Sequence, residues 1–124
     1  MSVILDPQYS TSKQETTIGI QKETKPPIKL SDIWKFASKE LEQIKVGFGD
    51  AKRRQACAMG AISYYLSNRE TCLLSELKYS WQKGLFRHLV KSFEARSGSS
   101  IWELNDVRGW AFEDFAGRAE ELGL

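Results

Sequence analysis

AKRRQACAMGAISYYLS, residues 51–67, is the stretch of sequence that decides the predicted fold. Read as a helix, with 100° between successive residues, it has no polar stripe. Small residues recur through it at steps of four, three and four, at Ala56, Gly60, Ser63 and Ser67. A helix that is apolar on nearly every side is buried, and small residues let a neighbour approach closely. We therefore expect residues 51–67 to form a buried central helix.

Three further stretches have the apolar spacing of amphipathic helices: residues 31–46, residues 72–97 and residues 110–122. Gly47 and Asp50 separate the first of these from the central helix, and a Ser-Gly-Ser-Ser loop over residues 97–100 follows the second. The predicted fold is therefore all-α, a compact bundle of about four helices around the central one. Its expected core includes Cys57, Gly60, Ile62, Tyr65, Trp81, Leu85 and Phe115.

Length and composition are those of one globular domain. The chain has 124 residues, 41% hydrophobic and 27% charged, and no apolar run approaches the roughly 20 residues of a membrane span. Residues 10–25 are too polar to bury the apolar area that offsets the entropy of ordering. We expect a flexible N-terminal tail over residues 1–30, a helical domain over residues 31–124, no membrane contact and a cytoplasmic location. Two apolar islands in the tail, residues 3–5 and 18–20, could instead dock on the domain or extend a partner's sheet.

The two cysteines and the single histidine form no catalytic or metal-binding pattern. In an antiparallel hairpin of residues 51–67 and 73–96, Cys57 and Cys72 lie roughly 15 Å apart along the helix axis. A disulfide needs Cα atoms within about 7 Å, so this arrangement predicts two reduced thiols. The same geometry separates Cys57 from His88 by roughly 9 Å, beyond hydrogen-bond reach. We expect no metal and no cofactor.

Lys52, Arg53 and Arg54 open the predicted central helix with a charge that opposes its macrodipole. Each cation in the first turn of a helix lowers its stability by a few tenths to about 1 kcal/mol. An unfavourable residue choice of this kind, with no local compensation, can indicate a functional site. In the predicted hairpin, Arg87 is level with Lys52, so two basic clusters meet at one end. The predicted anion- or partner-binding residues are Lys52, Arg53, Arg54, Lys83, Arg87 and Lys91.

The charges divide the chain into a basic and an acidic part. Residues 51–96 carry nine cations and three carboxylates, whereas residues 97–124 carry six carboxylates and two cations. The net charge of +2 therefore conceals a polarised molecule. We expect a non-enzymatic helical binding module whose basic end engages an acidic partner. That partner is either another protein or the acidic C-terminal helix of a second copy.

Three other interpretations of the sequence remain open. The same basic patch can bind the phosphate backbone of a nucleic acid, although the chain is less basic than is usual for that function. The protein can also be a small enzyme without a recognisable motif. Finally, the basic and acidic regions can neutralise each other within one monomer.

One pattern resembles a known group of sequences. The letters R-x-x-x-C-A-x-G-A-I over residues 53–62 are followed by I-W-x-x-N-D over residues 101–106 and then by an acidic amphipathic helix. This layout is similar to that of small, uncharacterised bacterial and phage proteins, which share a Cys-Ala-Leu-Gly-Ala helix and a later Trp-Asn-Asp turn. Met59 and Leu104 replace the leucine and the tryptophan of that group. The resemblance covers about residues 31–122 and implies a helical fold with no known activity.

Overall fold

The computed structural model describes residues 28–124, which fold into four α-helices, two short helical turns and a small sheet. The α-helices are α1 (Leu30–Glu40), α2 (Ala58–Leu66), α3 (Ser80–Ser97) and α4 (Phe112–Glu121). A 3₁₀ turn, η1 (Leu74–Glu76), precedes α3, and a π-helical turn, η2 (Glu103–Val107), precedes α4. The predicted N-terminal tail lies outside the described residues up to residue 27. Its last predicted residue, Leu30, already belongs to α1 and is buried.

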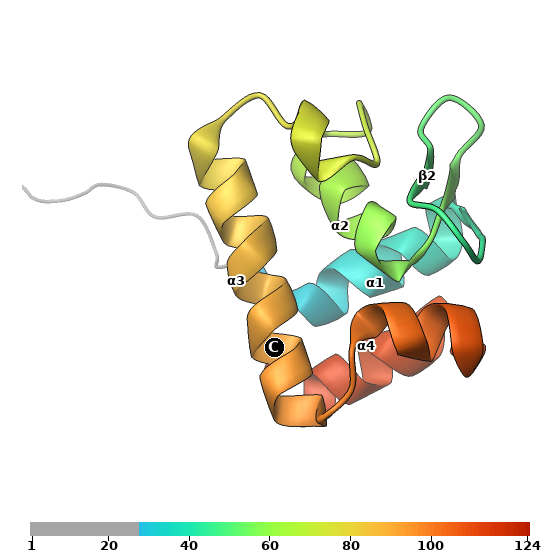
Figure 1. Cartoon of the computed structure of the whole chain (residues 1–124), viewed down its shortest axis with the longest axis vertical. Coiled ribbons are helices and arrows are strands. Elements are labelled where there is room, and N and C mark those ends of the chain that lie inside the picture. The colour runs from blue at the N-terminus through green and yellow to red at the C-terminus, as the bar shows by residue number, and fades with distance from the viewer. Residues whose placement is uncertain (1–27) are drawn as a thin grey trace, which may run out of the picture.

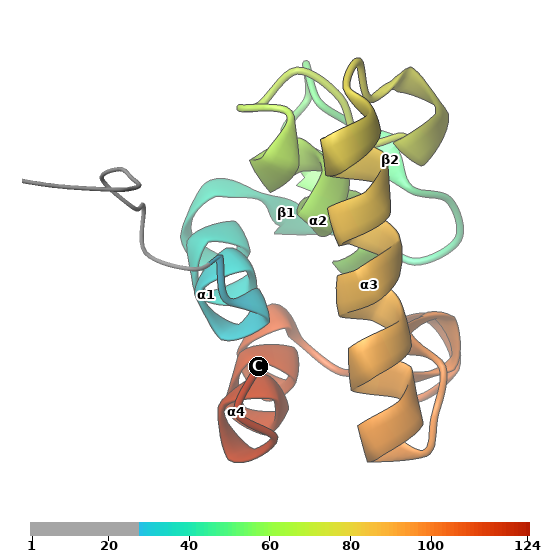
Figure 2. The ribbon, with the colours of Figure 1, turned by 90° about the vertical axis from the view of Figure 1, so that its left-hand side faces the viewer.

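α1 and α4 lie side by side, and α3 runs along the outside of the bundle (Figures 1 and 2). The backbone carbonyl of Leu124 accepts hydrogen bonds from both the amide and the hydroxyl of Ser31, which fixes the end of the chain beside the start of α1. An ion pair between Lys35 and Glu120 joins the exposed sides of the same two helices. No helix within residues 28–124 is long and apolar enough to cross a membrane.

The small sheet is the part of the fold that the all-α prediction missed. Its strands are β1 (Glu42–Gln43), β2 (Gly49–Asp50) and β3 (Gln55–Ala56), in the order β1-β3-β2. β3 pairs with β1 in parallel and with β2 in antiparallel orientation. Two-residue strands have no periodicity that a sequence can reveal. The first predicted helix, residues 31–46, therefore ends at Glu40, and its last residues enter β1 and the loop that follows.

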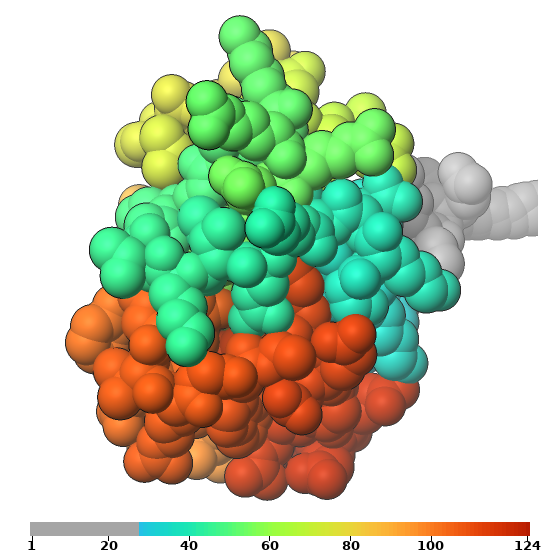
Figure 3. All heavy atoms as spheres, turned by 90° about the vertical axis from the view of Figure 1, so that its right-hand side faces the viewer, coloured from blue at the N-terminus to red at the C-terminus, as the bar shows by residue number. Residues whose placement is uncertain are grey.

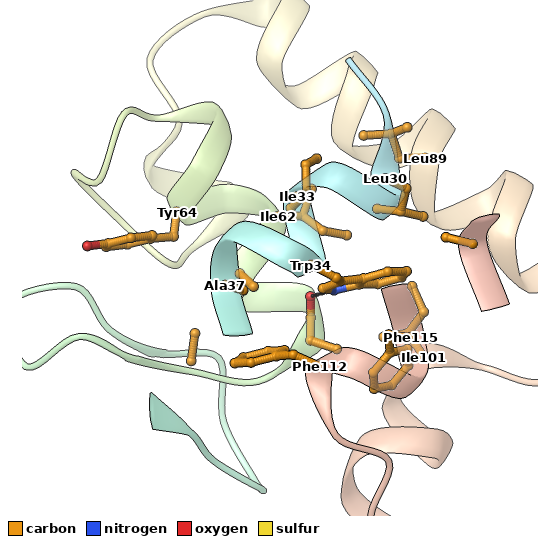
Figure 4. Close-up of a cluster of buried hydrophobic side chains, with 14 of the residues drawn as sticks. Leu30, Ile33, Trp34, Ala37, Ile62, Tyr64, Leu89, Ile101, Phe112 and Phe115 are labelled. Atoms are coloured by element: carbon orange, nitrogen blue, oxygen red, sulfur yellow. Dashed lines mark hydrogen bonds between the residues drawn. The ribbon is translucent and has the colours of Figure 1, made fainter. Parts of the chain in front are cut away.

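The core is centred on Trp34, which contacts the other three α-helices (Figure 4). Its ring packs edge-on against Phe93 of α3, with centroids 5.1 Å apart, and lies 4.9 Å from the ring of Phe115 of α4. Its indole N–H donates a 3.0 Å hydrogen bond to the carbonyl of Ala58 in α2. Burying a side chain of this size stabilises the fold by several kcal/mol, and the satisfied N–H removes the polar cost of that burial.

The predicted central helix is confirmed only over its second half. α2 is buried on nearly every side, but residues 51–56 form a turn and strand β3 instead of a helix. The Asp50 carboxylate accepts from the amide of Lys52, and the Asp50 carbonyl accepts from the amide of Arg53. Arg54 has a left-handed φ of 54° that closes this turn. The three cations therefore do not oppose a helix dipole, because no helix begins there.

The third predicted helix, residues 72–97, begins eight residues later than expected, at Ser80. The segment before it contains η1, and a β-region backbone at Leu77 and Tyr79 separates that turn from α3. This break changes the helical phase, so the face of α3 that packs inward carries Gln82, Phe86, Leu89 and Phe93. Trp81, predicted in the core, is instead 57% exposed.

The other predicted core residues have mixed outcomes. Tyr65 lies at the surface, 36% exposed, with its ring edge-on to Phe36, because its neighbour Tyr64 occupies the buried position. Leu85 is half-buried at the edge of the core. The remaining predictions are correct, and these residues are buried: Cys57, Gly60, Ile62 and Phe115.

Candidate functional site

The cations predicted to form one basic end lie on two separate elements. Lys52, Arg53 and Arg54 are exposed in the turn between β2 and β3, where Asp50 lies 3.8 Å from Arg53. Lys83, Arg87 and Lys91 lie on α3. Figure 1 shows the β2–β3 turn and α3 on opposite sides of α2. The structure therefore does not bring the two clusters together, because the long antiparallel hairpin that would have aligned them does not form.

One side of α3 is open to solvent and combines cations with aromatic rings. Arg87, His88 and Lys91 are exposed on it, Trp81 adds an indole at its start, and Lys83 lies half-buried at its edge. Within residues 28–124, no ion pair involves Lys83, Arg87 or Lys91. We call Trp81, Lys83, Arg87, His88 and Lys91 the basic face of α3. Figure 2 shows this helix in front of the bundle, with no other element covering it.

The two segments that carry the resemblance meet in space at a buried asparagine. The Asn105 side-chain oxygen accepts from the amide of Ala58, at the start of α2, and from the Gln43 side chain. Its NH₂ group donates to the carbonyl of Ile44 and to the carboxylate of Asp106. All four hydrogen bonds are 2.7–3.0 Å long, and Asn105 is 2% exposed. We call this arrangement the Asn105 network.

The glycine of the motif over residues 53–62, Gly60, lies in close contact with the backbone of Phe48. The Phe48 carbonyl accepts from the amide of Cys57, which brings the loop between β1 and β2 against the first turn of α2. A Cβ atom on Gly60 would lie 1.9 Å from that carbonyl oxygen, a separation no packing tolerates. The composition Asn-Asp-x-x-Gly over residues 105–109 is typical of a turn, yet the side chain of Asn105 is buried. Burial of a polar side chain has no signature in a single sequence.

A cavity of about 260 Å³ lies beside the Asn105 network. Its walls come from the loop between β1 and β2, the first turn of α2 and the segment that enters η2. Figure 3 shows the first and last of these next to one another on one face of the molecule. The cavity, hereafter the Asn105 pocket, is lined by Gly47, Phe48, Cys57, Met59, Ile101, Trp102, Asn105 and Asp106.

Two exposed aromatic residues of the described part of the chain, Phe48 and Trp102, line this pocket. Val46, Phe48, Trp102 and Val107 are among the large apolar residues that remain solvent-accessible, and Trp102 is 60% exposed. Trp102 was not predicted as a site residue. Helical spacing gives a retrospective signal for it, because Ile101 and Leu104 share the inward side of that turn and leave Trp102 outside.

Cys57 is a structural thiol rather than a nucleophile. Its sulfur accepts from the amide of Gly60 at 3.3 Å and so caps α2. Burial raises the pKa of the Cys57 thiol, and the nearby Asp106 carboxylate acts in the same direction. A raised pKa lowers the fraction of reactive thiolate. His88 is exposed on α3, so it provides no general base for this thiol.

The second thiol, Cys72, lies closer to Cys57 than the predicted hairpin allowed. Its sulfur lies 3.5 Å from the carbonyl of Gln55, two residues before Cys57, because the chain after α2 folds back along β3. Both thiols are unbridged in the structure. Within residues 28–124, no group of three or more His, Cys, Asp or Glu side chains is arranged to hold a metal ion.

Comparisons with protein-family models, with curated proteins and with solved structures give no match to this chain. Two surfaces of the described residues have features of a binding site: the basic face of α3 and the Asn105 pocket.

Proposed function

We propose that the protein is a non-enzymatic binding module that engages an acidic protein surface through the basic face of α3. The observation that carries this proposal is the row formed by Lys83, Arg87 and Lys91. These residues are spaced by four, so they lie one helical turn apart. Within the described part of the chain they have no carboxylate partner. A row of cations that the fold itself does not neutralise steers an anionic partner toward the surface.

The aromatic residues at the start of α3 favour a protein partner over a purely electrostatic one. Trp81 and Tyr79 are 57% and 58% exposed, although burying rings of this size is strongly favourable. Trp, Tyr and Arg are the side chains most enriched among residues that dominate protein–protein affinity. A partner that covers the indole of Trp81 gains free energy from burying the ring. If its carboxylates also contact Arg87 and Lys91, it gains free energy from the ion pairs as well.

The acidic helix α4 gives less support to self-association. Asp114 accepts from the amide of Ala111 and so caps its own helix, Glu120 pairs with Lys35, and Glu121 pairs with Arg118. Three of its four carboxylates thus have local partners in the same protomer. None of the described ion pairs joins α4 to α3. The carboxylates of α4 therefore do not neutralise the cations of α3, which remain able to bind an anionic partner.

Two charge-reversed variants test which basic surface binds. The first is Arg87→Glu with Lys91→Glu, on α3. The matched control is Lys52→Glu with Arg54→Glu in the β2–β3 turn, which changes the net charge equally. Titrating each with a labelled oligo-glutamate peptide and with a single-stranded oligonucleotide of equal charge separates protein from nucleic-acid preference. Circular dichroism checks that both variants remain folded.

We expect the α3 variant to lose binding of the acidic peptide and the turn variant to keep most of it. Binding by the wild type should weaken as salt rises, because exposed charges are screened over about 10 Å at 0.1 M. Trp81→Ala should weaken binding without changing its salt dependence. The proposal is wrong if the turn variant loses binding and the α3 variant retains it. Tighter binding of the oligonucleotide, lost in the α3 variant, would instead favour nucleic acid as the partner.

A further inference from the structure

We propose that the Asn105 pocket binds a small organic cation, an alkylammonium or guanidinium group, between the Asp106 carboxylate and the rings of Trp102 and Phe48. This inference goes beyond the proposed function, because it concerns a different surface and a ligand of opposite charge.

The Asp106 carboxylate is the charged group of the pocket. One of its oxygens accepts from the Asn105 side chain at 2.7 Å, which holds the carboxylate in place. Within residues 28–124 this carboxylate forms no ion pair, and the nearest arginine in sequence, Arg108, pairs with Glu103 at 3.4 Å. The second carboxylate oxygen therefore has acceptor capacity for a ligand.

The pocket walls suit a cation with an apolar body. Phe48 and Trp102 present aromatic rings, whose faces attract alkylammonium and guanidinium groups. Met59 adds a polarizable thioether that adapts to irregular ligands. A cavity of about 260 Å³ lies near the lower end of the sizes typical of ligand sites. It therefore accommodates a group the size of one lysine or arginine side chain rather than a nucleotide or a large cofactor.

The electrostatics of the pocket exclude an anion, even though α2 begins at its wall. The amides of Ala58 and Gly60, which a helix N-terminus would offer to an anion, already donate to Asn105 and to the Cys57 sulfur. The remaining macrodipole corresponds to about half a positive charge, less than the full negative charge of Asp106. The Asp106 carboxylate therefore makes the pocket negative.

Nuclear magnetic resonance of the full-length protein tests the proposal with three probes. n-Butylammonium and methylguanidinium are the cations, and 1-pentanol is a neutral molecule of similar length. We expect saturable shifts of the Trp102 indole N–H and of the Asp106 and Phe48 amides with both cations. Blocked lysine and blocked arginine, compared with the free amines, show whether the pocket prefers a side chain within a peptide or a small metabolite-like amine.

Asp106→Asn is the decisive variant, because it removes the charge while keeping an oxygen that can accept from Asn105. It should weaken cation binding about ten- to hundred-fold, the usual worth of a charge-assisted hydrogen bond. Trp102→Ala should weaken it by roughly two- to five-fold. Glu113→Gln, which removes an exposed carboxylate from α4, is the control and should bind as the wild type does.

Three results would overturn the proposal. One is the absence of saturable shifts with either cation. The second is equal affinity for 1-pentanol, which would make the pocket a merely apolar cavity. The third is unchanged cation affinity in a folded Asp106→Asn protein. None of these outcomes alters the test of the basic face of α3, so the two proposals can fail independently.

Discussion

At the scale of single residues, Gly60 shows the sharpest steric constraint in the fold. The carbonyl oxygen of Phe48 lies 1.9 Å from the position that a Cβ atom would take. That carbonyl cannot withdraw without losing its hydrogen bond from the amide of Cys57, which is 3.1 Å long. The loop between β1 and β2 and the first turn of α2 therefore fit together only when residue 60 has no side chain.

Gly60→Ala is expected to lower the free energy of unfolding by about 1–3 kcal/mol or more, as overpacking in a rigid core does. Urea denaturation of the variant and the wild type measures this loss. Gly117→Ala is the matched control, since a Cβ there meets nothing within 4 Å in the middle of α4. It should instead gain up to about 1 kcal/mol from the higher helix propensity of alanine. Equal midpoints for Gly60→Ala and the wild type would contradict the close contact.

The buried thiol of Cys72 predicts a pH dependence of stability. Burial, with a further contribution from Cys57 and Asp50, raises the pKa of this thiol from 9.0 to about 11. The folded state therefore keeps the proton over a range in which the unfolded chain loses it. Stability is therefore not affected by this group below the unfolded pKa near 9, and it falls by at most about 2–3 kcal/mol as the pH rises through about 11, because the buried thiol must then ionise.

The measurement compares the wild type with Cys72→Ala by urea denaturation at several pH values up to 11. The difference in unfolding free energy between the two proteins should shrink as the pH rises, because only the wild type loses the thiol contribution. Other groups that titrate in this range cancel in the difference. A constant difference over the whole range would show that the thiol does not have a raised pKa.

Near the Asn105 pocket, the sequence predicts that Cys57 and Gly60 are buried, but it does not predict the polar and aromatic residues that line the pocket. Gly60 does lie in a close contact, as a small residue in an apolar helix suggests, but the contact is with the backbone carbonyl of Phe48 in a loop rather than with a helix or an aromatic ring. The composition of residues 105–109 predicts only a turn, whereas the hydrogen bonds of buried Asn105 reach Gln43 and Ile44, some sixty residues earlier. Long-range hydrogen bonds of this kind leave no local pattern.

At the scale of elements, a single glutamine connects α2 to α3. The Gln82 side chain donates to the carbonyl of Leu66, at the last residue of α2, and accepts from the amide of Tyr79, just before α3. Both groups belong to helix ends, where backbone donors and acceptors lack intrahelical partners. Gln82 is buried, and its hydrogen bond to the carbonyl of Leu66 is shielded from solvent.

Gln82→Leu is expected to destabilise the protein by about 1–3 kcal/mol for each backbone group left unpaired, although leucine is nearly as large and more apolar. Thermal unfolding followed by circular dichroism measures the loss. Lys83→Leu, at the adjacent half-buried position, is the control. The control should change the melting temperature far less. If Gln82→Leu were as stable as the wild type, the helix ends would have other partners.

The boundaries of the elements were harder to predict than their type. Lys52, Arg53 and Arg54 were assigned to the first turn of a helix that their charges oppose, and this conflict was interpreted as a sign of function. The structure resolves it differently, since the three residues close a turn around Asp50. Three cations in the first turn of a predicted helix therefore indicated that the helix does not begin there, and α2 begins at Ala58. Similarly, Trp81 is exposed because the helical backbone is interrupted before Ser80. No proline or glycine in the sequence marks this interruption.

At the scale of the whole molecule, the predicted helical bundle is correct in its main feature and wrong in its centre. Four α-helices do surround one buried group, but that group is the side chain of Trp34 rather than the helix of residues 51–67. The apolar spacing of each helix identified its inner face, as for Phe112 and Phe115 of α4. Periodicity within a helix does not say how one helix is oriented against another, so the alignment of the basic clusters could not be predicted.

The last prediction concerns the part of the chain that suffices for folding. A chain that begins at residue 28 should unfold cooperatively at nearly the melting temperature of the full chain. Leu30, Ile33 and Trp34 are fully buried, and the ring and hydrogen-bond partners of Trp34, which are Phe93, Phe115 and Ala58, all lie within residues 28–124. Calorimetry of both lengths is the measurement. Since 1 kcal/mol shifts the melting temperature of such a domain by about 4–8 °C, a larger fall in the short chain would place residues 3–5 or 18–20 in the core.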